Sequence, residues 1–172
     1  MSLNKQLNGD QLYKRQIDKR KLNAPVIICD GLKTPDNLGA IFRVADAAGS
    51  NEIILIDSQI DIKNKKISKL SRSTDKFINL KNMTFEDFQT YSSRHDKMFA
   101  LEITTSSSNI FDSDISHCDA IIIGHESTGI REKVLDLCDN TFHLPMFGIN
   151  GSMNISHALV VFLYEWRRQK ML

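Results

Sequence analysis

Small polar residues crowd the approach to the last apolar segment of the chain, where residues 148–161 read GINGSMNISHALVV. Ser152, Asn154 and Ser156 fall within five consecutive positions of this segment, behind two glycines. A single Ser or Asn is enough to accept hydrogen bonds from the first free backbone N–H groups of a helix. Capping therefore does not account for all three side chains, and a second use for their hydroxyl and amide groups has to be sought.

Three glycine-containing loops each follow an apparent strand. In an open α/β sheet, ligands gather at the loops beyond the carboxyl ends of the strands, and such a fold would bring these loops to one edge. Any one of them alone is more simply a connection, because Gly and Pro mark turns in every fold. Together they predict a shared ligand site. The loops read DGLKTPDNLGAIFR at 30–43, GHESTGIRE at 124–132 and LPMFGINGSMN at 144–154.

Several common kinds of site are not indicated. None of the loops contains G-x-G-x-x-G or G-x-x-x-x-G-K-[ST], so the sequence favours neither a dinucleotide fold nor a P-loop. The five histidines lack the spacing of a zinc site, so we expect no metal and place most of them at the surface or in packing. Cys29, Cys118 and Cys138 are odd in number and far apart, which predicts buried thiols.

Length and composition favour one globular domain. The chain has 172 residues, 41% of them hydrophobic and 25% charged, enough for one sizeable core. No apolar run approaches the roughly 18 to 20 residues that a membrane span needs, and the N-terminus lacks the apolar centre of a signal peptide. We therefore expect a cytoplasmic protein without membrane contact. Its domain should span residues 25–172, behind a basic and helical extension at 1–24.

Charge is distributed unevenly, although the formal net charge is only +1. Residues 1–25 and 61–76 each carry six basic and two acidic side chains, a net charge of +4, whereas residues 77–150 carry five basic and eleven acidic ones. Distribution matters more to a surface field than the total. Basic patches on an acidic remainder would suit a nucleic-acid partner, but solvated faces explain the charge equally well.

Short apolar runs alternate with helical patterns, and continuous runs of this kind are typical of strands buried on both faces of a parallel sheet. The runs lie at 25–30, 52–57, 97–102, 119–125 and 141–144. Helices are predicted over 37–48 with Gly49 as C-cap, after Thr84 as N-cap, and over 154–170. The alternation predicts an α/β fold, a mostly parallel sheet flanked by helices.

The three loops also carry a family resemblance. D-N-L-G-A-I-F-R followed by A-D-A-A-G, then I-I-G-H-E-S-T-G-I, then L-P-M-F-G-I-N-G-S-M-N-I-S followed by L-Y-E, resemble the ordered motifs of the SpoU (TrmH) RNA 2'-O-ribose methyltransferases of the SPOUT superfamily. The likeness covers residues 26–170. It implies a SPOUT-type α/β knot, in which the C-terminal segment forms a deep trefoil knot, although true knots are otherwise almost absent from folds.

The resemblance implies S-adenosylmethionine as methyl donor, wrapped by the third motif. The sulfonium is already activated, so no metal is chemically required. Met153 stands where the family usually has Leu, a volume-conserving exchange, and His125 where it more often has Asn. The residues expected to bind the cofactor are Leu101, Glu102, Gly124, Leu144, Met146 and Met153.

Five residues match the catalytic positions of the family: Arg43, Asn37, Glu126, Ser152 and Asn154. The resemblance makes Arg43 either the base for the hydroxyl proton or a clamp on phosphate, and a guanidinium pKa above about 12 favours the clamp. Asn37 would tie its loop to the site, and Glu126 would pair with a basic or hydroxyl group, orienting Arg43. Ser152 and Asn154 would lie near the target ribose, with helix capping as the alternative or additional role.

The resemblance further implies a homodimer acting on RNA, with tRNA slightly favoured over rRNA because the chain is compact and has basic patches. The apolar stripe Ile155, Leu159, Phe162 and Trp166 suits a dimer interface or an ordinary core face. Two other functions stay open. One is a non-catalytic, knotted RNA-binding protein, and the other is a small-molecule enzyme with a nucleotide cofactor.

Overall fold

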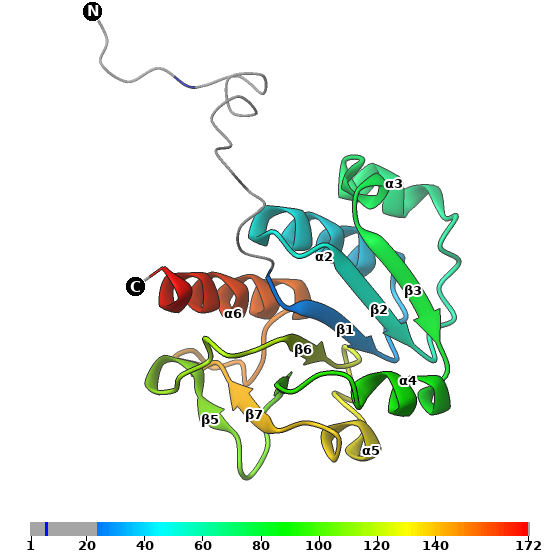
Figure 1. The fold of residues 1–172 in the computed structure, drawn as a ribbon. Helices are drawn as coiled ribbons and strands as arrows, with labels where there is room; N and C mark the ends of the chain where they lie inside the picture. The colour runs from blue at the N-terminus through cyan, green and yellow to red at the C-terminus, as the bar shows by residue number, and fades with distance from the viewer. Residues whose placement is uncertain (1–5, 7–23, 172) are drawn as a thin grey trace, which may run out of the picture.

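A parallel sheet of seven strands forms the centre of the described structure, in the order β3-β2-β1-β6-β4-β7-β5 (Figure 1). The computed structural model describes Gln6 and residues 24–171, so the helical extension predicted for 1–24 lies outside the described residues except at Gln6 and Ala24. The strands are β1 Val26–Asp30, β2 Glu52–Ile56, β3 Asn79–Met83, β4 Met98–Leu101, β5 Ser108–Asn109, β6 Ala120–Ile123 and β7 Asn140–His143.

The five strands predicted from apolar runs are confirmed, and the two that were missed are the polar edges of the sheet. The central strands β1 and β6 pair Ile27 with Ile121 and Ile28 with Ile122, and all four side chains are buried. Edge strand β3 reads NLKNM and is largely exposed, while edge strand β5 has only two residues. A strand that is buried on no more than one side does not need a continuous run of apolar residues, so its sequence does not reveal it.

Helices cover both faces of the sheet, as predicted (Figure 1). Helices α2 (Pro35–Ala48) and α6 (Ile155–Lys170) bury one face, whereas α4 (Phe85–Ser92) and α5 (Glu132–Leu135) bury the other. Helix α3 (Lys65–Ser71) packs on α2, and single 3-10 turns form at η1 (Thr74–Lys76) and η2 (Ile110–Asp112). The predicted caps are confirmed: Gly49 is left-handed at φ 80°, and the Thr84 side chain accepts from the Asp87 N–H.

The apolar stripe of α6 packs into the chain's own core. Leu159 and Phe162 have no exposed surface, and Trp166 is 2% exposed. Partly buried Ile155 packs against the same cluster. Of the two interpretations that the sequence allowed for this stripe, the core face is therefore the one observed.

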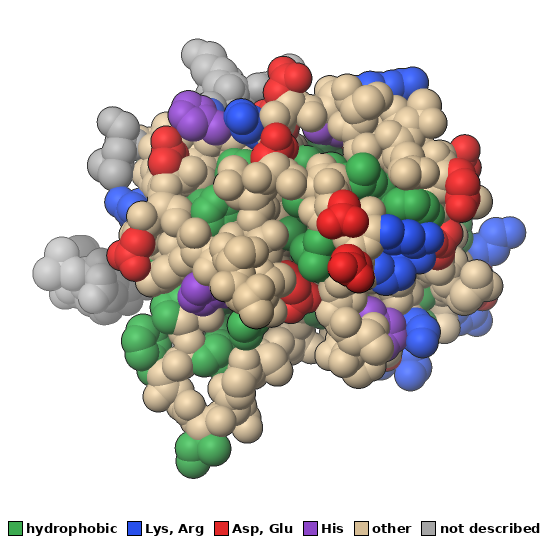
Figure 2. Space-filling view, turned by 90° about the horizontal axis from the view of Figure 1, so that it is seen from below, with side chains coloured by type: hydrophobic (Ala, Val, Ile, Leu, Met, Phe, Trp, Pro, Cys, Tyr) green, Lys and Arg blue, Asp and Glu red, His purple; other side chains and the backbone are tan. Residues whose placement is uncertain are grey.

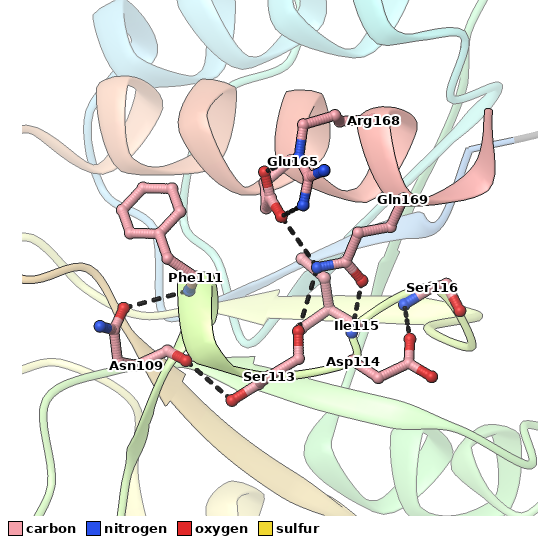
Figure 3. A network of polar contacts seen from close by, with 9 residues as sticks. All are labelled: Asn109, Phe111, Ser113, Asp114, Ile115, Ser116, Glu165, Arg168 and Gln169. Carbon is pink, nitrogen blue, oxygen red and sulfur yellow. Dashed lines mark hydrogen bonds and ion pairs between the residues drawn. The ribbon is translucent and has the colours of Figure 1, made fainter. Parts of the chain in front are cut away.

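A polar network fixes the C-terminal end of α6 (Figure 3). Gln169 Oε1 accepts from the Ile115 N–H at 2.9 Å, while its Nε2 donates to the Ser113 carbonyl at 3.0 Å and to Glu165 Oε1 at 2.8 Å. Arg168 donates to both Glu165 oxygens. These bonds fix the C-terminal end of α6, and the rigid helix in turn fixes the position of its first turn.

The cysteines lie in apolar surroundings. Cys29 and Cys118 are buried as predicted, and Cys138 is only partly buried. Burial raises the pKa of Cys29 and Cys118 well above the ordinary value, and that of Cys138 to about 12, so all three are protonated thiols at neutral pH. Within residues 24–171, no helix combines the length and apolarity needed to cross a bilayer.

Candidate functional site

Hydrogen bonds join the three glycine-containing loops. Asn154 Nδ2 donates to Asn37 Oδ1 at 3.1 Å, and Asn37 Nδ2 donates in turn to Glu126 Oε1 at 2.7 Å. Thr34 Oγ1 donates to the same Glu126 oxygen at 2.7 Å. One directed chain of bonds therefore runs from the third loop through the first to the second, across up to 117 residues of sequence.

The small polar residues before α6 divide into two groups. Asn154 is the N-cap of the helix, because its Oδ1 accepts from the Ser156 N–H at 2.9 Å and from Ser156 Oγ at 2.7 Å. Its amide group thus caps with the oxygen and reaches Asn37 with the nitrogen. Ser152 makes no side-chain hydrogen bond within the described residues and lines a cavity instead. Capping is therefore one role of Asn154 and no role of Ser152.

The turn that presents Glu126 is closed by its own backbone. His125 and Gly129 exchange two N–H···O bonds of 3.0 Å each, and Gly129 is left-handed at φ 71°. Inside the turn, His125 Nδ1 accepts from the Ser127 N–H at 3.1 Å and from the Thr128 N–H at 3.3 Å. Gly124 is needed for closure, because a Cβ at this position would lie 2.2 Å from the Gly129 carbonyl carbon.

Two further contacts hold this turn to the sheet. Glu102, at the end of β4, accepts from the Ile130 N–H at 3.0 Å. Buried Asp30, at the end of β1, accepts from the Arg131 backbone N–H and from Arg131 Nε, both at 2.8 Å. Arg131 Nη1 also donates to Asp57 Oδ2 at 2.7 Å. The carboxyl ends of three strands or the residues just beyond them are thereby locked to the second loop.

A cavity of about 540 Å³ opens beside these contacts, within the usual range for small-molecule sites. Its walls come from the ends of β4, β6 and β7, the turn after β6 and the segment before α6. The ionisable side chains that line it are acidic residues and histidines, with no Lys or Arg among the described lining residues. Nine residues expected from the sequence line it: Leu101, Glu102, Gly124, Glu126, Leu144, Met146, Ser152, Met153 and Asn154.

Glu126 is a carboxylate at neutral pH. Partial burial on its own would raise the pKa of Glu126, but hydrogen bonds from Thr34 and Asn37 and the neighbouring His125 bring that pKa below its ordinary value. Both side-chain donors end on Oε1. Neither of these bonds uses Oε2, whose ion-pair neighbour among the described residues is His125 Nε2 at 3.9 Å, so Oε2 can still accept a hydrogen bond.

Arg43 lies apart from this cluster. It is exposed on α2, does not line the cavity, and makes no hydrogen bond or ion pair with any described residue. Glu126 instead pairs with the Thr34 hydroxyl, one of the two kinds of partner expected for it, and with the Asn37 amide. It has no contact with Arg43 among the described residues, so the expectation that it orients Arg43 is wrong for the contacts within this chain. The guanidinium is left free to meet a group outside the chain.

Sequence reasoning missed several residues of the site. Thr34 stands at the N-cap position of α2, yet its hydroxyl donates to Glu126 and makes no cap bond. The pairing of Asp30 with Arg131 left no local signal other than a carboxylate at a strand end. His125 and His143 line the cavity, although most histidines were expected at the surface or in packing.

The same part of the chain matches a known family. Residues 24–164 match the family described as SpoU rRNA Methylase family. The chain belongs to this family. All three loops of the site lie within the matched range, so the resemblance found in the sequence is confirmed.

Similar proteins include RNA-modifying enzymes. RlmB of Blochmanniella floridana, a 23S rRNA (guanosine-2'-O-)-methyltransferase, is 30% identical over 95% of this chain and 65% of that protein, so the chain spans less than two thirds of its length. The SpoU methyltransferase AviRb from Streptomyces viridochromogenes, solved with the cofactor AdoMet, has a TM-score of 0.77 at 22% identity, over 90% of this chain and 64% of that chain. A structure concerning 2-OH methylation of C/U34 on tRNA has a TM-score of 0.72 at 25% identity, and the match covers 86% of this chain and 98% of that chain.

Proposed function

We propose that this chain is an S-adenosylmethionine-dependent RNA methyltransferase that transfers the methyl group to a ribose 2'-hydroxyl. The observation that carries the proposal is the chain of hydrogen bonds from Asn154 through Asn37 to Glu126, which assembles three remote loops beside one cavity. Membership of the SpoU family and the activity of RlmB, a 23S rRNA (guanosine-2'-O-)-methyltransferase, support the reaction type.

The cavity fits the proposed cofactor. Apolar side chains of Leu101, Leu144 and Met153 suit the faces of an adenine ring, while the backbone groups around Gly124 suit its polar edge. Glu102 and Glu126 give the cavity a negative charge, which favours a cationic ligand. When bound, S-adenosylmethionine supplies an activated methyl group on a sulfonium. AviRb, which shares the fold, binds AdoMet. Among the described residues, no group of His, Cys, Asp and Glu could hold a metal ion.

The protein side chains then have to orient a ribose and handle one proton. We assign the ribose contacts to Ser152, which is unpaired and faces the cavity, and to Glu126 Oε2, which can accept a hydrogen bond from the 2'-hydroxyl. Asn37 and Asn154 position Glu126 through the directed bonds. Arg43 is assigned as the clamp on an RNA phosphate, because bidentate phosphate binding is the ordinary chemistry of an exposed guanidinium.

The RNA class and the assembly belong to the same proposal. Compactness and the basic stretch favour tRNA slightly, while RlmB acts on 23S rRNA. We further propose a cytoplasmic homodimer, with residues 25–172 as the methyltransferase domain, residues 1–24 as a basic extension, and a C-terminal trefoil knot. Sedimentation of the purified chain tests the dimer, and a crystal structure traced through residues 119–170 tests the knot.

The decisive experiment is incubation with methyl-labelled S-adenosylmethionine and total RNA, followed by fractionation of tRNA and rRNA and nucleoside mass spectrometry. We expect label in a 2'-O-methylnucleoside, and its loss in Arg43→Ala. Arg94→Ala, a change at another exposed arginine, is the matched control and should keep the label.

Other outcomes separate the alternatives. Label on a base would contradict the assigned chemistry. RNA binding without cofactor binding in calorimetry would favour a non-catalytic RNA-binding protein. Cofactor turnover on a small molecule, with no label in RNA, would favour a small-molecule enzyme.

A further inference from the structure

The outer edge of the molecule carries a cluster of cations that outnumber the carboxylates of the same stretch, six to two. We call it the α3 surface, and its six members are all exposed: Lys63, Lys65, Lys66, Lys69, Arg72 and Lys76. Of these six side chains, only Lys66 has an ion-pair partner among the described residues, which is Asp36 at 3.9 Å. A concentration of unpaired positive charge makes a strong local field, and it attracts a polyanion.

The two acidic residues of this stretch accept hydrogen bonds within it, and against six cations they offset only part of the positive charge. Asp75 accepts from Ser71 Oγ and from Ser68 Oγ, and Asp61 accepts from the Lys63 backbone N–H. The largest influence on Asp75, its hydrogen bond from Ser71, lowers the pKa of that carboxyl. These bonds also hold η1 against the end of α3, so that Lys76 stays beside the helix.

An exposed aromatic ring lies at the end of the same surface. Phe77 directly follows η1 and is 75% exposed. Water contact of so large an apolar ring is unfavourable, and exposed aromatics between cations are the usual platform on which proteins stack unpaired bases of RNA. A polyanion without bases would bind the cations only. Single-stranded RNA offers phosphates to the cations and unpaired bases to the ring of Phe77.

The α3 surface is joined to the candidate site through α2. Gly39 allows the two helices to pack closely, because a Cβ there would lie 2.7 Å from Leu70 Cβ. Asp36, the partner of Lys66, immediately precedes Asn37 of the site. Arg43 is exposed one helical turn beyond Gly39. RNA held on α3 would thus run past the first turns of α2.

The face formed by α4 and α5 has a different character. Seen from below, acidic and basic side chains are intermixed there (Figure 2). Arg131, for example, is paired with Asp30 and Asp57. Basic side chains on this face are thus interspersed with acidic ones, unlike those of the α3 surface.

We propose that the α3 surface binds the sugar-phosphate backbone of a single-stranded RNA segment, with Phe77 stacking on an unpaired base. The proposal rests on the proposed function, since it names how the RNA substrate of that site is held. The lysines and Arg72 supply affinity without reading sequence, and Phe77 distinguishes an unpaired segment from a duplex.

The test compares two charge-matched double variants, Lys69→Gln with Arg72→Gln on the α3 surface and Arg94→Gln with Lys97→Gln elsewhere. Binding to a short oligouridylate is measured over a series of salt concentrations. For the α3 variant we expect affinity to fall about tenfold or more, and the slope of log K against log salt to decrease by about 0.7 per lost phosphate contact. The control variant should keep the wild-type affinity and slope.

Phe77→Leu tests the ring separately. We expect about tenfold weaker binding of oligouridylate, an unchanged salt slope, and unchanged binding of a blunt RNA duplex. Equal binding by the α3 and control variants would overturn the phosphate contacts, and unaltered oligouridylate binding by Phe77→Leu would overturn the stacking. An acidic protein as the true partner would give that same null result with RNA.

Calorimetry with S-adenosylmethionine verifies that each variant is folded, because the cavity lies on other elements. If the wild-type chain transfers no methyl group to RNA, but the α3 variant binds oligouridylate more weakly than the wild type, the proposed function fails and the RNA-binding surface stands. If it methylates RNA and the α3 variant matches the control in KM for RNA, the α3 proposal fails alone.

Discussion

The two ends of helix α6 use polar side chains in opposite ways. At the N-terminal end, Asn154 is exposed, caps the helix and reaches Asn37 beside an open cavity. At the C-terminal end, Gln169 and Glu165 are satisfied by each other and by the segment around Ile115 (Figure 3). One end leaves hydrogen-bonding capacity for a ligand, and the other uses that capacity up. The helix is anchored at one end and functional at the other, so activity and stability should be separable along it.

The largest effect on activity is expected from the exposed guanidinium on the site side. Arg43→Ala should lower methyl transfer about a hundredfold or more, because the RNA phosphate loses its clamp. The free energy of unfolding should change by less than about 0.5 kcal/mol, because the side chain has no partner among the described residues. Single-turnover kinetics and urea unfolding measure the two quantities. Arg43→Lys keeps the positive charge but not the bidentate hydrogen bonding of a guanidinium. Its rate of methyl transfer should lie between those of the wild type and Arg43→Ala.

At the N-terminal end of α6, two substitutions of Asn154 separate its two bonds. Asn154→Ala should cost about 1 kcal/mol of stability through the lost cap and lower methyl transfer about tenfold. Asn154→Ser restores a cap but not the donor to Asn37. We therefore expect Ser to recover the stability and not the activity. Recovery of both would show that the bond to Asn37 has no role in catalysis.

At the anchored end, Gln169→Ala should reverse this pattern. Loss of three hydrogen bonds leaves the Ile115 N–H and the Ser113 carbonyl without their partner, at a cost of about 1 to 3 kcal/mol. Affinity for S-adenosylmethionine at a temperature well below unfolding should stay within a factor of about two. Urea unfolding measures the stability, and calorimetry measures the affinity for S-adenosylmethionine. Weakened cofactor binding without destabilisation would contradict the separation of an anchored end of α6 from a functional end.

A smaller effect is expected from pH. Hydrogen bonds hold the pKa of Glu126 below its ordinary value of 4.5 in the folded chain, despite partial burial. A lowered folded-state pKa adds stability above the ordinary pKa, and that stability is lost as pH falls through the folded-state value. Below about pH 4.5, wild type should therefore lose stability more steeply than Glu126→Gln. Equal slopes for the two in acid urea titrations would contradict the bonds to Glu126.

Sequence patterns predicted the parts of the fold that depend on burial. The runs of Ile in β1 and β6 and the stripe of α6 were found because a buried element must be apolar at defined positions. Edge strand β3 was missed because exposure lets its residues be polar. Helix α3 was missed for the same reason, since within it only Ile67 and Ser71 are buried.

For the site, the sequence motifs predicted which loops come together. They did not predict which hydrogen bonds join those loops. Asn37, Glu126 and Asn154 were named from the resemblance, and the structure brings them within hydrogen-bonding distance. The bond from Thr34 to Glu126 and the pairing of Asp30 with Arg131 depend on strand order, which local spacing does not encode. The expected pairing of Glu126 with Arg43 is not observed, because Arg43 lies on the exposed face of α2 while Glu126 bonds Thr34 and Asn37.

A double-mutant cycle between Asn37 and Asn154 tests most directly whether the remote loops act as one site. The rate of methyl transfer is measured for Asn37→Ala, Asn154→Ala and the double variant at saturating S-adenosylmethionine. If the bond of 3.1 Å between the two side chains matters, the double variant should be no slower than the slower single variant, within about twofold. Losses that simply multiply would mean that the two loops contribute independently, and would contradict the shared site.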